Sequence, residues 1–184
     1  MNIFVVDKDP VIAAQSLCDK HIVKMIVESG QMLSTAHRVL DGDEWTDYGK
    51  NGRRIKRWRL KDDREDYLWK ASFVRHPCTV WTMENSINYN WHWQHAYALC
   101  KEYTSRYNKT HSSEHLIRKL RKEPDRLSAM YPHSMTEFAQ AMPDEYKVKG
   151  DAVSAYRKYY RGEKTPFAKW TNRKAPTWFQ ETSV

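Results

Sequence analysis

The feature that most constrains the fold is a long apolar segment with one narrow line of polar residues. Asp9 followed by Pro10 is a typical helix start, and the pattern predicts a helix from Pro10 to Leu40. At about 100° per residue, one line of this helix carries His21, Lys24, Glu28, Gln31 and Thr35. The remaining positions are mostly apolar or small, which predicts a helix buried on nearly every side. Its charged groups must then either face a cleft or pair with one another.

Length and composition limit the classes of protein to which this chain can belong. The chain has 184 residues, a length typical of a single domain and sufficient for a hydrophobic core. Its formal net charge is +8, and it contains eight Trp and eleven Tyr. This combination favours a polyanionic partner such as nucleic acid, whose bases stack on aromatic rings. An anionic membrane surface is a less frequent alternative, and solubility alone is the plain explanation of a basic charge.

Cysteine usage and the first residues favour a reducing compartment. Cys18, Cys78 and Cys100 are odd in number and lack CxxC spacing, which argues against a disulfide framework and a zinc knuckle. His92 and His95 lie one helical turn apart, but no known ligand motif accompanies them. The run MNIFVVDKDP does not have the pattern of a signal peptide, and no segment approaches the length of a membrane span. We expect a cytoplasmic protein with a nucleic-acid partner, and no membrane, cofactor or metal.

Basic residues are concentrated in one segment. Residues 1–49 carry eight acidic and four basic residues, whereas residues 50–75 carry ten basic and four acidic ones. Trp58, Tyr67 and Trp69 are interleaved with these bases. The combination of basic and aromatic residues indicates a segment that binds a phosphate backbone. The alternative is a solvated surface loop. The candidate DNA-binding residues here are Arg53, Arg54, Lys56, Arg57 and Arg59.

The patterning predicts an all-α fold. We expect a single compact domain of about four helices around the buried first helix, with an extended N-terminus and an irregular, basic, aromatic C-terminal segment. Ile3–Val6 is the only β-like run and is too short to build a sheet. The expected parts are the N-terminus with the catalytic helix (1–40), a basic loop (41–75), a second long helix (76–107), an insertion (113–166) and an aromatic tail (167–184). The basic loop begins with a flexible link, Asp41–Asn51, and the second long helix begins at Pro77. Within 113–166 we expect shorter helices at Ser113–Lys122 and Asp151–Tyr160, and an irregular stretch, Arg121–Lys149, with a turn of helix near Glu137–Met142.

Glu28 is the strongest catalytic candidate. A partly buried carboxylate near Lys24 would serve as a general base or stabilise a developing cation. A structural ion pair between Glu28 and Lys24, spaced i, i+4, is equally compatible with the spacing. Lys24 would be an amine nucleophile if it were desolvated, and His21 lies on the same line of the helix.

The order of these residues resembles the phage-type pyrimidine dimer DNA glycosylases, the endonuclease V family, and their short bacterial relatives. The family pattern is Asp-x-His followed, seven residues after the His, by a catalytic Glu; here Asp19, His21 and Glu28 stand at those offsets. The resemblance continues in His76-Pro77 with Trp81, and in the segment RKAPTWF. It covers residues 1–40, 76–107 and 173–179, and leaves Glu114–Pro166 as an insertion.

The resemblance implies a mechanism. The α-amine of the first residue attacks the deoxyribose C1′, displaces the base and leaves a Schiff base, while the Glu assists sugar opening and a later β-elimination that nicks the strand. An α-amine suits this task, because its ordinary pKa of about 7.7–8.0 leaves a useful neutral fraction near pH 7. The amine would belong to Met1, because Asn2 is too large for the usual removal of methionine. The catalytic candidates are therefore Met1, Glu28, His21 and Lys24.

Two departures from the family pattern leave the lesion open. Family members that recognise dimers have Arg immediately before the Glu and again three residues after it, where this chain has Val27 and Gln31. The resemblance implies DNA as the partner, and the host cytoplasm as the location if the protein is viral. The substrate is then a dimer or another damaged or modified base. Further DNA-binding candidates are Gln31, Lys169, Arg173, Lys174 and Trp178. A base-modifying or nucleotide-hydrolysing enzyme on the same scaffold, or a non-catalytic nucleic-acid or nucleotide binder, remains the alternative.

Overall fold

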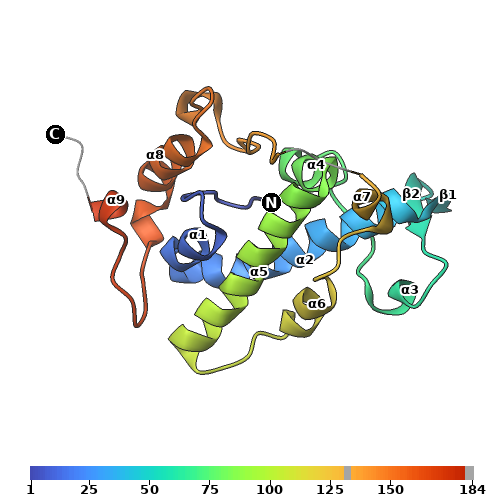
Figure 1. Cartoon of the computed structure of the whole chain (residues 1–184), viewed down its shortest axis with the longest axis horizontal. Coiled ribbons are helices and arrows are strands. Elements are labelled where there is room, and N and C mark those ends of the chain that lie inside the picture. Colours follow the sequence, from blue (N-terminus) through green and yellow to red (C-terminus); the bar gives the residue numbers. More distant parts are fainter. Residues whose placement is uncertain (131–133, 181–184) are drawn as a thin grey trace.

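The computed structural model describes residues 1–130 and 134–180, and it is mostly helical (Figure 1). A two-stranded hairpin lies at one end of the molecule and α8 with α9 at the other, with α5 crossing in front of α2 (Figure 1). The elements in chain order are α1 (Pro10–Ser16), α2 (Asp19–Asp41), β1 (Asp43–Tyr48), β2 (Arg54–Arg59), α3 (Arg64–Tyr67), α4 (Pro77–Glu84), α5 (Ser86–Tyr107), α6 (Glu114–Lys119), α7 (Asp125–Ser128), the 3₁₀ turn η1 (Asp144–Tyr146), α8 (Ala152–Lys164), the 3₁₀ turn η2 (Thr165–Phe167) and α9 (Thr177–Gln180).

The core is built around α2, as the sequence predicts. α2 packs against α4 and α5, and its side chains Ile22, Met25, Ile26, Met32 and Leu33 are buried almost completely. Burying each of these large apolar side chains stabilises the fold by about 1.5–3 kcal/mol relative to leaving it in water. The face of α2 that carries Glu28 points away from α5, because the apolar positions face α5.

The predicted continuous first helix is wrong in one respect: it is two helices, α1 and α2. Asp9 caps α1 as expected, by accepting hydrogen bonds from two backbone N–H groups of the first turn. The N–H of Cys18 then donates to the hydroxyl of Tyr160 at 2.9 Å, and the N–H of Asp19 donates to the carbonyl of Lys169 at 2.8 Å. The chain breaks here because the C-terminal segment satisfies donors that a continuous helix would satisfy internally.

The predicted second helix is also two helices. Asn85 between α4 and α5 has an extended backbone, and its side chain accepts a hydrogen bond from the N–H of Asn88 at 2.9 Å. Asn85 is therefore the N-cap of a new helix, a role for which asparagine is among the preferred residues. The predicted turn of helix at Glu137–Met142 is wrong, because that stretch is not helical and short turns form at α7 and η1 instead.

A hairpin replaces the predicted flexible link and loop, so the fold is not strictly all-α. β1 and β2 pair antiparallel, with Glu44 opposite Trp58, and are joined through a turn in which Gly52 has a φ of +72°. Glycine adopts this left-handed conformation without a steric penalty, and Asn-Gly is a strong hairpin signal. Ile3–Val6, the β-like run, is buried and has no strand assignment.

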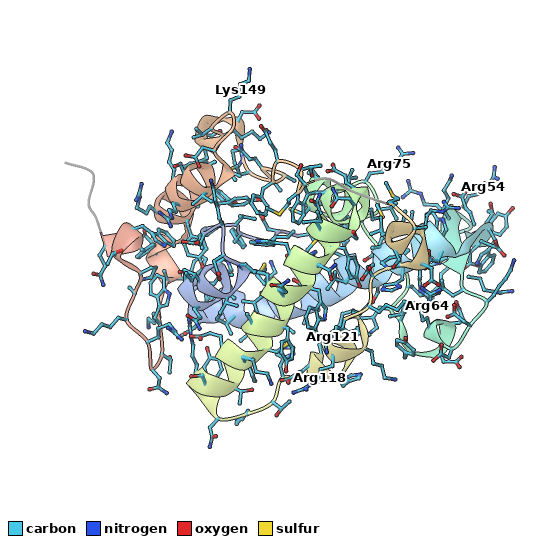
Figure 2. All side chains as sticks on the ribbon, viewed as in Figure 1. Arg54, Arg64, Arg75, Arg118, Arg121 and Lys149 are labelled. Atoms are coloured by element: carbon cyan, nitrogen blue, oxygen red, sulfur yellow. The ribbon has the colours of Figure 1, made fainter. Side chains whose placement is uncertain are left out.

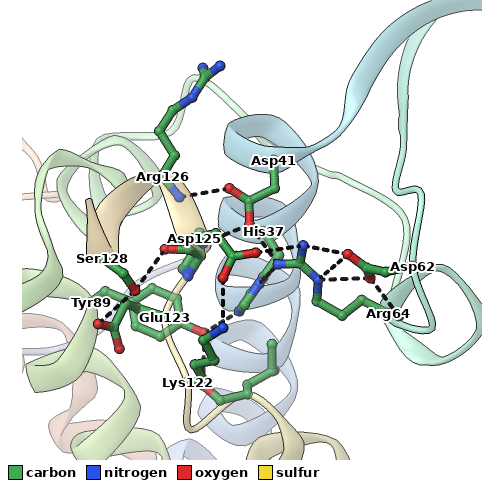
Figure 3. A network of polar contacts seen from close by, with 12 residues as sticks. His37, Asp41, Asp62, Arg64, Tyr89, Lys122, Glu123, Asp125, Arg126 and Ser128 are labelled. Carbon is green, nitrogen blue, oxygen red and sulfur yellow. Dashed lines mark hydrogen bonds and ion pairs between the residues drawn. The ribbon is translucent and has the colours of Figure 1, made fainter. Parts of the chain in front are cut away.

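Residues 113–166, the apparent insertion, are part of the core architecture. The carboxylate of Asp41, the last residue of α2, accepts the backbone N–H groups of Asp125 and Arg126 at 2.8 and 3.1 Å (Figure 3). The same carboxylate accepts from Arg64 at 2.6 Å, and Arg64 also lies 3.0 Å from the ring of His37 (Figure 3). The end of α2 therefore caps the start of α7 and anchors this segment.

Two features are absent from the described ranges. No helix there is long and apolar enough to cross a bilayer. Residues 1–130 and 134–180 also hold no group of three or more His, Cys, Asp or Glu arranged to bind a metal ion. Cys18, Cys78 and Cys100 are buried free thiols.

Candidate active site

The amino end of the chain lies inside the fold, next to Glu28 of α2 (Figure 1). The Met1 amine nitrogen is 3.8 Å from Glu28 Oε2, and the backbone N–H of Asn2 donates to the same oxygen at 2.8 Å. Lys24 Nζ lies 3.3 Å from Glu28 Oε1, whereas Gln31, the next residue along the polar line, is half-buried. Two of the four catalytic candidates, Met1 and Lys24, thus lie within 4 Å of the carboxylate of a third, Glu28.

The side chain of Asn2 bends the chain so that the amine points at Glu28. Its Oδ1 accepts the N–H groups of Ile3 and Phe4 at 2.8 and 3.2 Å, and its Nδ2 donates to the carbonyl of Ala141 at 2.7 Å. Phe4 has a φ of +57°, a conformation that costs a non-glycine residue about 1–3 kcal/mol. The surrounding contacts of Asn2 therefore fix a strained turn that a free terminus would not adopt.

A pocket of about 210 Å³ opens beside the amine. Its walls come from the first residues, from α2, from the segment before η1 and from α8. The lining residues are Met1, Asn2, Phe4, His21, Lys24, Met25, Glu28, Ala141, Tyr159 and Lys164. Most of these present polar atoms, so the pocket suits a sugar or a phosphate better than an apolar ligand.

His21, the remaining catalytic candidate, lines this pocket as an uncharged side chain. Its ring stacks on Phe4 with centroids 4.4 Å apart, and its Nδ1 lies 2.6 Å from the hydroxyl of Tyr160. Burial, and then the charges of Lys164 and Lys24, lower the pKa of His21 to about 3. The imidazole is therefore uncharged at neutral pH and is better suited to positioning Phe4 than to donating a proton.

His76 also belongs to the site, although the sequence assigned it no catalytic or binding role and marked it only as part of a His-Pro motif before a helix. Its Nδ1 accepts the N–H of Cys78 at 3.2 Å and so caps α4. Burial, and then the nearby N-terminal ammonium, lower the pKa of His76, while Glu28 and a hydrogen bond to the Met1 backbone oppose that shift. Its ring thus lies close to both the amine and the carboxylate.

Tyr159 and Ala141 were missed by the sequence, and Lys164 was predicted only as part of a basic C-terminal stretch (Lys164 to Lys174) that would hold DNA, not as a residue of this pocket. They lie in the segment that neither motif nor periodicity connects to the catalytic helix. Only the docking of α8 and the segment before η1 brings them to the pocket, so no local signal marks them.

The strand residues among the DNA-binding candidates are partly neutralised by the hairpin itself. Lys56 Nζ pairs with Glu44 at 2.8 Å, and Arg57 lies 3.4 Å from Asp47 across the hairpin. Arg59 lies over a tryptophan ring of β1 at 5.3 Å. These basic side chains are therefore less available to phosphates than their number suggests.

The basic side chains at the turn of the hairpin are exposed to solvent. Arg53 and Arg54 are exposed, and the described part of the chain contains no ion pair for either. Arg54 projects outward at the end of the molecule (Figure 2). About 20 Å of helix separates Glu28 from the base of the hairpin, so these residues would contact DNA away from the reacting nucleotide.

The C-terminal candidates divide into buried and exposed residues. Trp178 is 8% exposed and packs in the core, so its ring does not present a stacking surface for bases. Arg173 donates to Glu102 at 2.7 Å and fastens the tail to α5. Lys169 and Lys174 are exposed and remain accessible to a phosphate backbone.

Comparison with known proteins identifies a family. A family model described as pyrimidine dimer DNA glycosylase matches residues 1–115, more than half of the chain. No curated protein and no solved structure gives a match. The matched range includes Met1, α2 and His76, but it ends before the segment that supplies Ala141, Tyr159 and Lys164 to the pocket.

Proposed function

The chain belongs to the pyrimidine dimer DNA glycosylase family, and from this premise we propose that it removes a damaged base through the α-amine of Met1. One observation carries the proposal. The amine lies 3.8 Å from Glu28 Oε2, in a pocket that opens to solvent. An amine beside a carboxylate and an open pocket has what covalent catalysis at a sugar carbon requires.

The proposed reaction begins with attack of the neutral Met1 amine on C1′ of the deoxyribose. The bond from C1′ to the base breaks, and the base leaves with that electron pair and takes up a proton. Opening of the sugar ring gives a protonated C1′ Schiff base. Loss of a C2′ proton then expels the 3′ phosphate by β-elimination, and water hydrolyses the imine and frees the amine. Glu28 accepts the proton from the attacking amine and stabilises the cationic imine.

We assign the attack to Met1 and not to Lys24. The Lys24 side chain is 67% exposed, so its ammonium keeps most of its hydration and is not activated by burial. Lys24 instead neutralises one oxygen of Glu28 and leaves the other directed at the amine. His21 and His76 hold the turn and the Met1 backbone in place.

DNA binding is proposed for the pocket rim, for the turn of the hairpin and for the exposed tail lysines. Extrusion of a nucleotide from a duplex costs a few kcal/mol, which these phosphate contacts would offset. The lesion is a pyrimidine dimer or another altered base, because Val27 and Gln31 occupy the positions of the two family arginines.

The test is borohydride trapping on irradiated, abasic and undamaged duplexes. We expect a covalent adduct on abasic DNA, mapped by mass spectrometry to Met1; an adduct on irradiated DNA as well would make a pyrimidine dimer the lesion, and its absence there would point to another altered base. Glu28→Gln should lower the trapping rate by roughly 10²–10⁴-fold with duplex binding retained. Glu145→Gln, an exposed carboxylate on η1, is the matched control and should trap like the wild type.

Other outcomes would overturn the proposal. An adduct on Lys24, or trapping that survives an extra residue placed before Met1, would exclude the Met1 amine. Turnover without any adduct would favour a base-modifying or nucleotide-hydrolysing reaction. Salt-dependent binding without turnover would favour a non-catalytic binder.

A further inference from the structure

The pocket wall that faces α2 carries a lysine without an acidic partner. Lys164 Nζ lies 3.1 Å from the hydroxyl of Tyr159 and 4.4 Å from the centre of its ring. No carboxylate of the described residues is within ion-pair distance of Lys164, and its neighbour Glu163 accepts from Tyr146 instead. An ammonium group has three N–H donors, so Lys164 is held in place by Tyr159 while two donors stay free.

Positive charge exceeds negative charge around the pocket mouth. The Met1 amine, Lys24 and Lys164 supply three cations, and Glu28 is the one carboxylate among the lining residues. Lys24 belongs to α2 and Lys164 to α8, and the charges of both lower the pKa of the buried His21. Glu28 is the counterion of Lys24 and the Met1 amine, so its single negative charge leaves an excess of positive charge that attracts an anion, and a pocket lined by polar atoms suits a hydrated one.

We propose that Lys164, positioned by Tyr159 and acting with Lys24 across the pocket, binds a backbone phosphate of the DNA strand that carries the target nucleotide. A deoxyribose presented to the Met1 amine brings its own flanking phosphates to the pocket rim, where the free donors of Lys164 lie. This inference rests on the proposed function, because the anion it names is the backbone of a DNA substrate. It assigns a binding role to α8, which lies outside the residues that the family model matches.

The test compares Lys164→Gln with Lys158→Gln, a control on the same helix. Lys158 is exposed, donates to the carbonyl of Glu145 at 3.0 Å and does not line the pocket. The probe is a duplex with a tetrahydrofuran abasic analogue, which binds but cannot form a Schiff base. Fluorescence anisotropy from about 50 to about 200 mM salt gives the slope of log affinity against log salt. Lys164→Gln should weaken binding and reduce that slope by about one, whereas Lys158→Gln should leave it unchanged.

Two further variants separate charge from shape. Lys164→Arg should keep the wild-type slope, because it keeps the cation. Tyr159→Phe should weaken binding less than Lys164→Gln does, because the ring still supports the ammonium.

The inference fails if Lys164→Gln keeps the wild-type slope or if Lys158→Gln loses as much. It also fails if inorganic phosphate at constant ionic strength protects the wild type against thermal unfolding while the DNA slope does not change, because the site would then hold free phosphate. The anisotropy assay involves no chemistry. If Lys164→Gln reduces the salt slope but no adduct forms on any duplex, only the proposed reaction is refuted. If trapping is normal and the salt slope of Lys164→Gln is unchanged, only this inference is refuted.

Discussion

Replacing His95 by leucine should make the protein more resistant to acid. His95 is buried in α5, and neither ring nitrogen has a hydrogen-bond partner in the described part of the structure. Burial lowers its pKa to about 3, so the ring stays neutral in the folded protein, whereas it binds a proton in the unfolded chain below its ordinary pKa of 6.5. The unfolded state therefore binds more protons between pH 6.5 and about 3, and the free energy of unfolding falls as the pH falls through that window.

The size of the effect follows from linkage. One such group costs about 1.4 kcal/mol of stability between pH 7.5 and pH 5.5. His21 and His92, with pKa values lowered to about 3, and His37, lowered to about 4, add similar amounts. Together the four histidines remove roughly 5–6 kcal/mol, which is comparable with the whole stability of many domains.

Urea unfolding followed by tryptophan fluorescence at about pH 7.5 and about pH 5.5 measures this directly. The leucine variant loses the stacking of His95 on Trp91, in which the ring centroids are 5.4 Å apart. This loss is equal at both pH values and cancels in the comparison. The stability of the variant relative to the wild type should rise by about 1.4 kcal/mol on going to the lower pH. His115→Leu is the control, because His115 is exposed. An equal difference at both pH values would refute a neutral, buried His95.

Three other substitutions have expected outcomes. Gly30→Ala places a Cβ 2.9 Å from Trp69 Cζ3, so the overpacking should outweigh the better helix propensity and lower the melting temperature by a few degrees in calorimetry. Glu102→Gln removes the carboxylate that pairs with Arg173 and one of the two that pair with Arg106, at a site that is 3% exposed, and should cost about 3 kcal/mol in urea unfolding. Replacing both Arg53 and Arg54 by Gln should reduce the salt slope of duplex binding by about two while leaving single-turnover trapping at saturating DNA unchanged.

The parts of the fold that depend on local pattern could be predicted from the sequence. The polar line on α2 and its burial follow from periodicity alone, and the ion pair of Glu28 with Lys24 follows from i, i+4 spacing. Two missed features had local signals: Asn85 is a preferred N-cap, and Asn51-Gly52 is a hairpin turn. The hairpin was obscured because its exposed strands carry charges and lack the alternation of a half-buried sheet.

The remaining features depend on contacts between distant residues. The break between α1 and α2 requires Tyr160 and Lys169, which lie more than a hundred residues away. The wall formed by Tyr159 and Lys164 exists only because α8 docks near the amino end. Periodicity and spacing describe neighbours along the chain, so they do not reach such pairs. The position of Met1 beside Glu28 was expected only from the family resemblance.

The location of the amine at the centre of the fold affects when the protein becomes able to act during its synthesis. In this chain Met1 and Asn2 leave the ribosome early, but Asn2 is held by Ala141, and the facing wall includes Lys164. The pocket therefore cannot close until more than 160 residues have been made and released. A nascent or prematurely terminated chain carries the reactive amine and the carboxylate without the wall around them. For the proposed reaction, such a fragment should therefore be inactive.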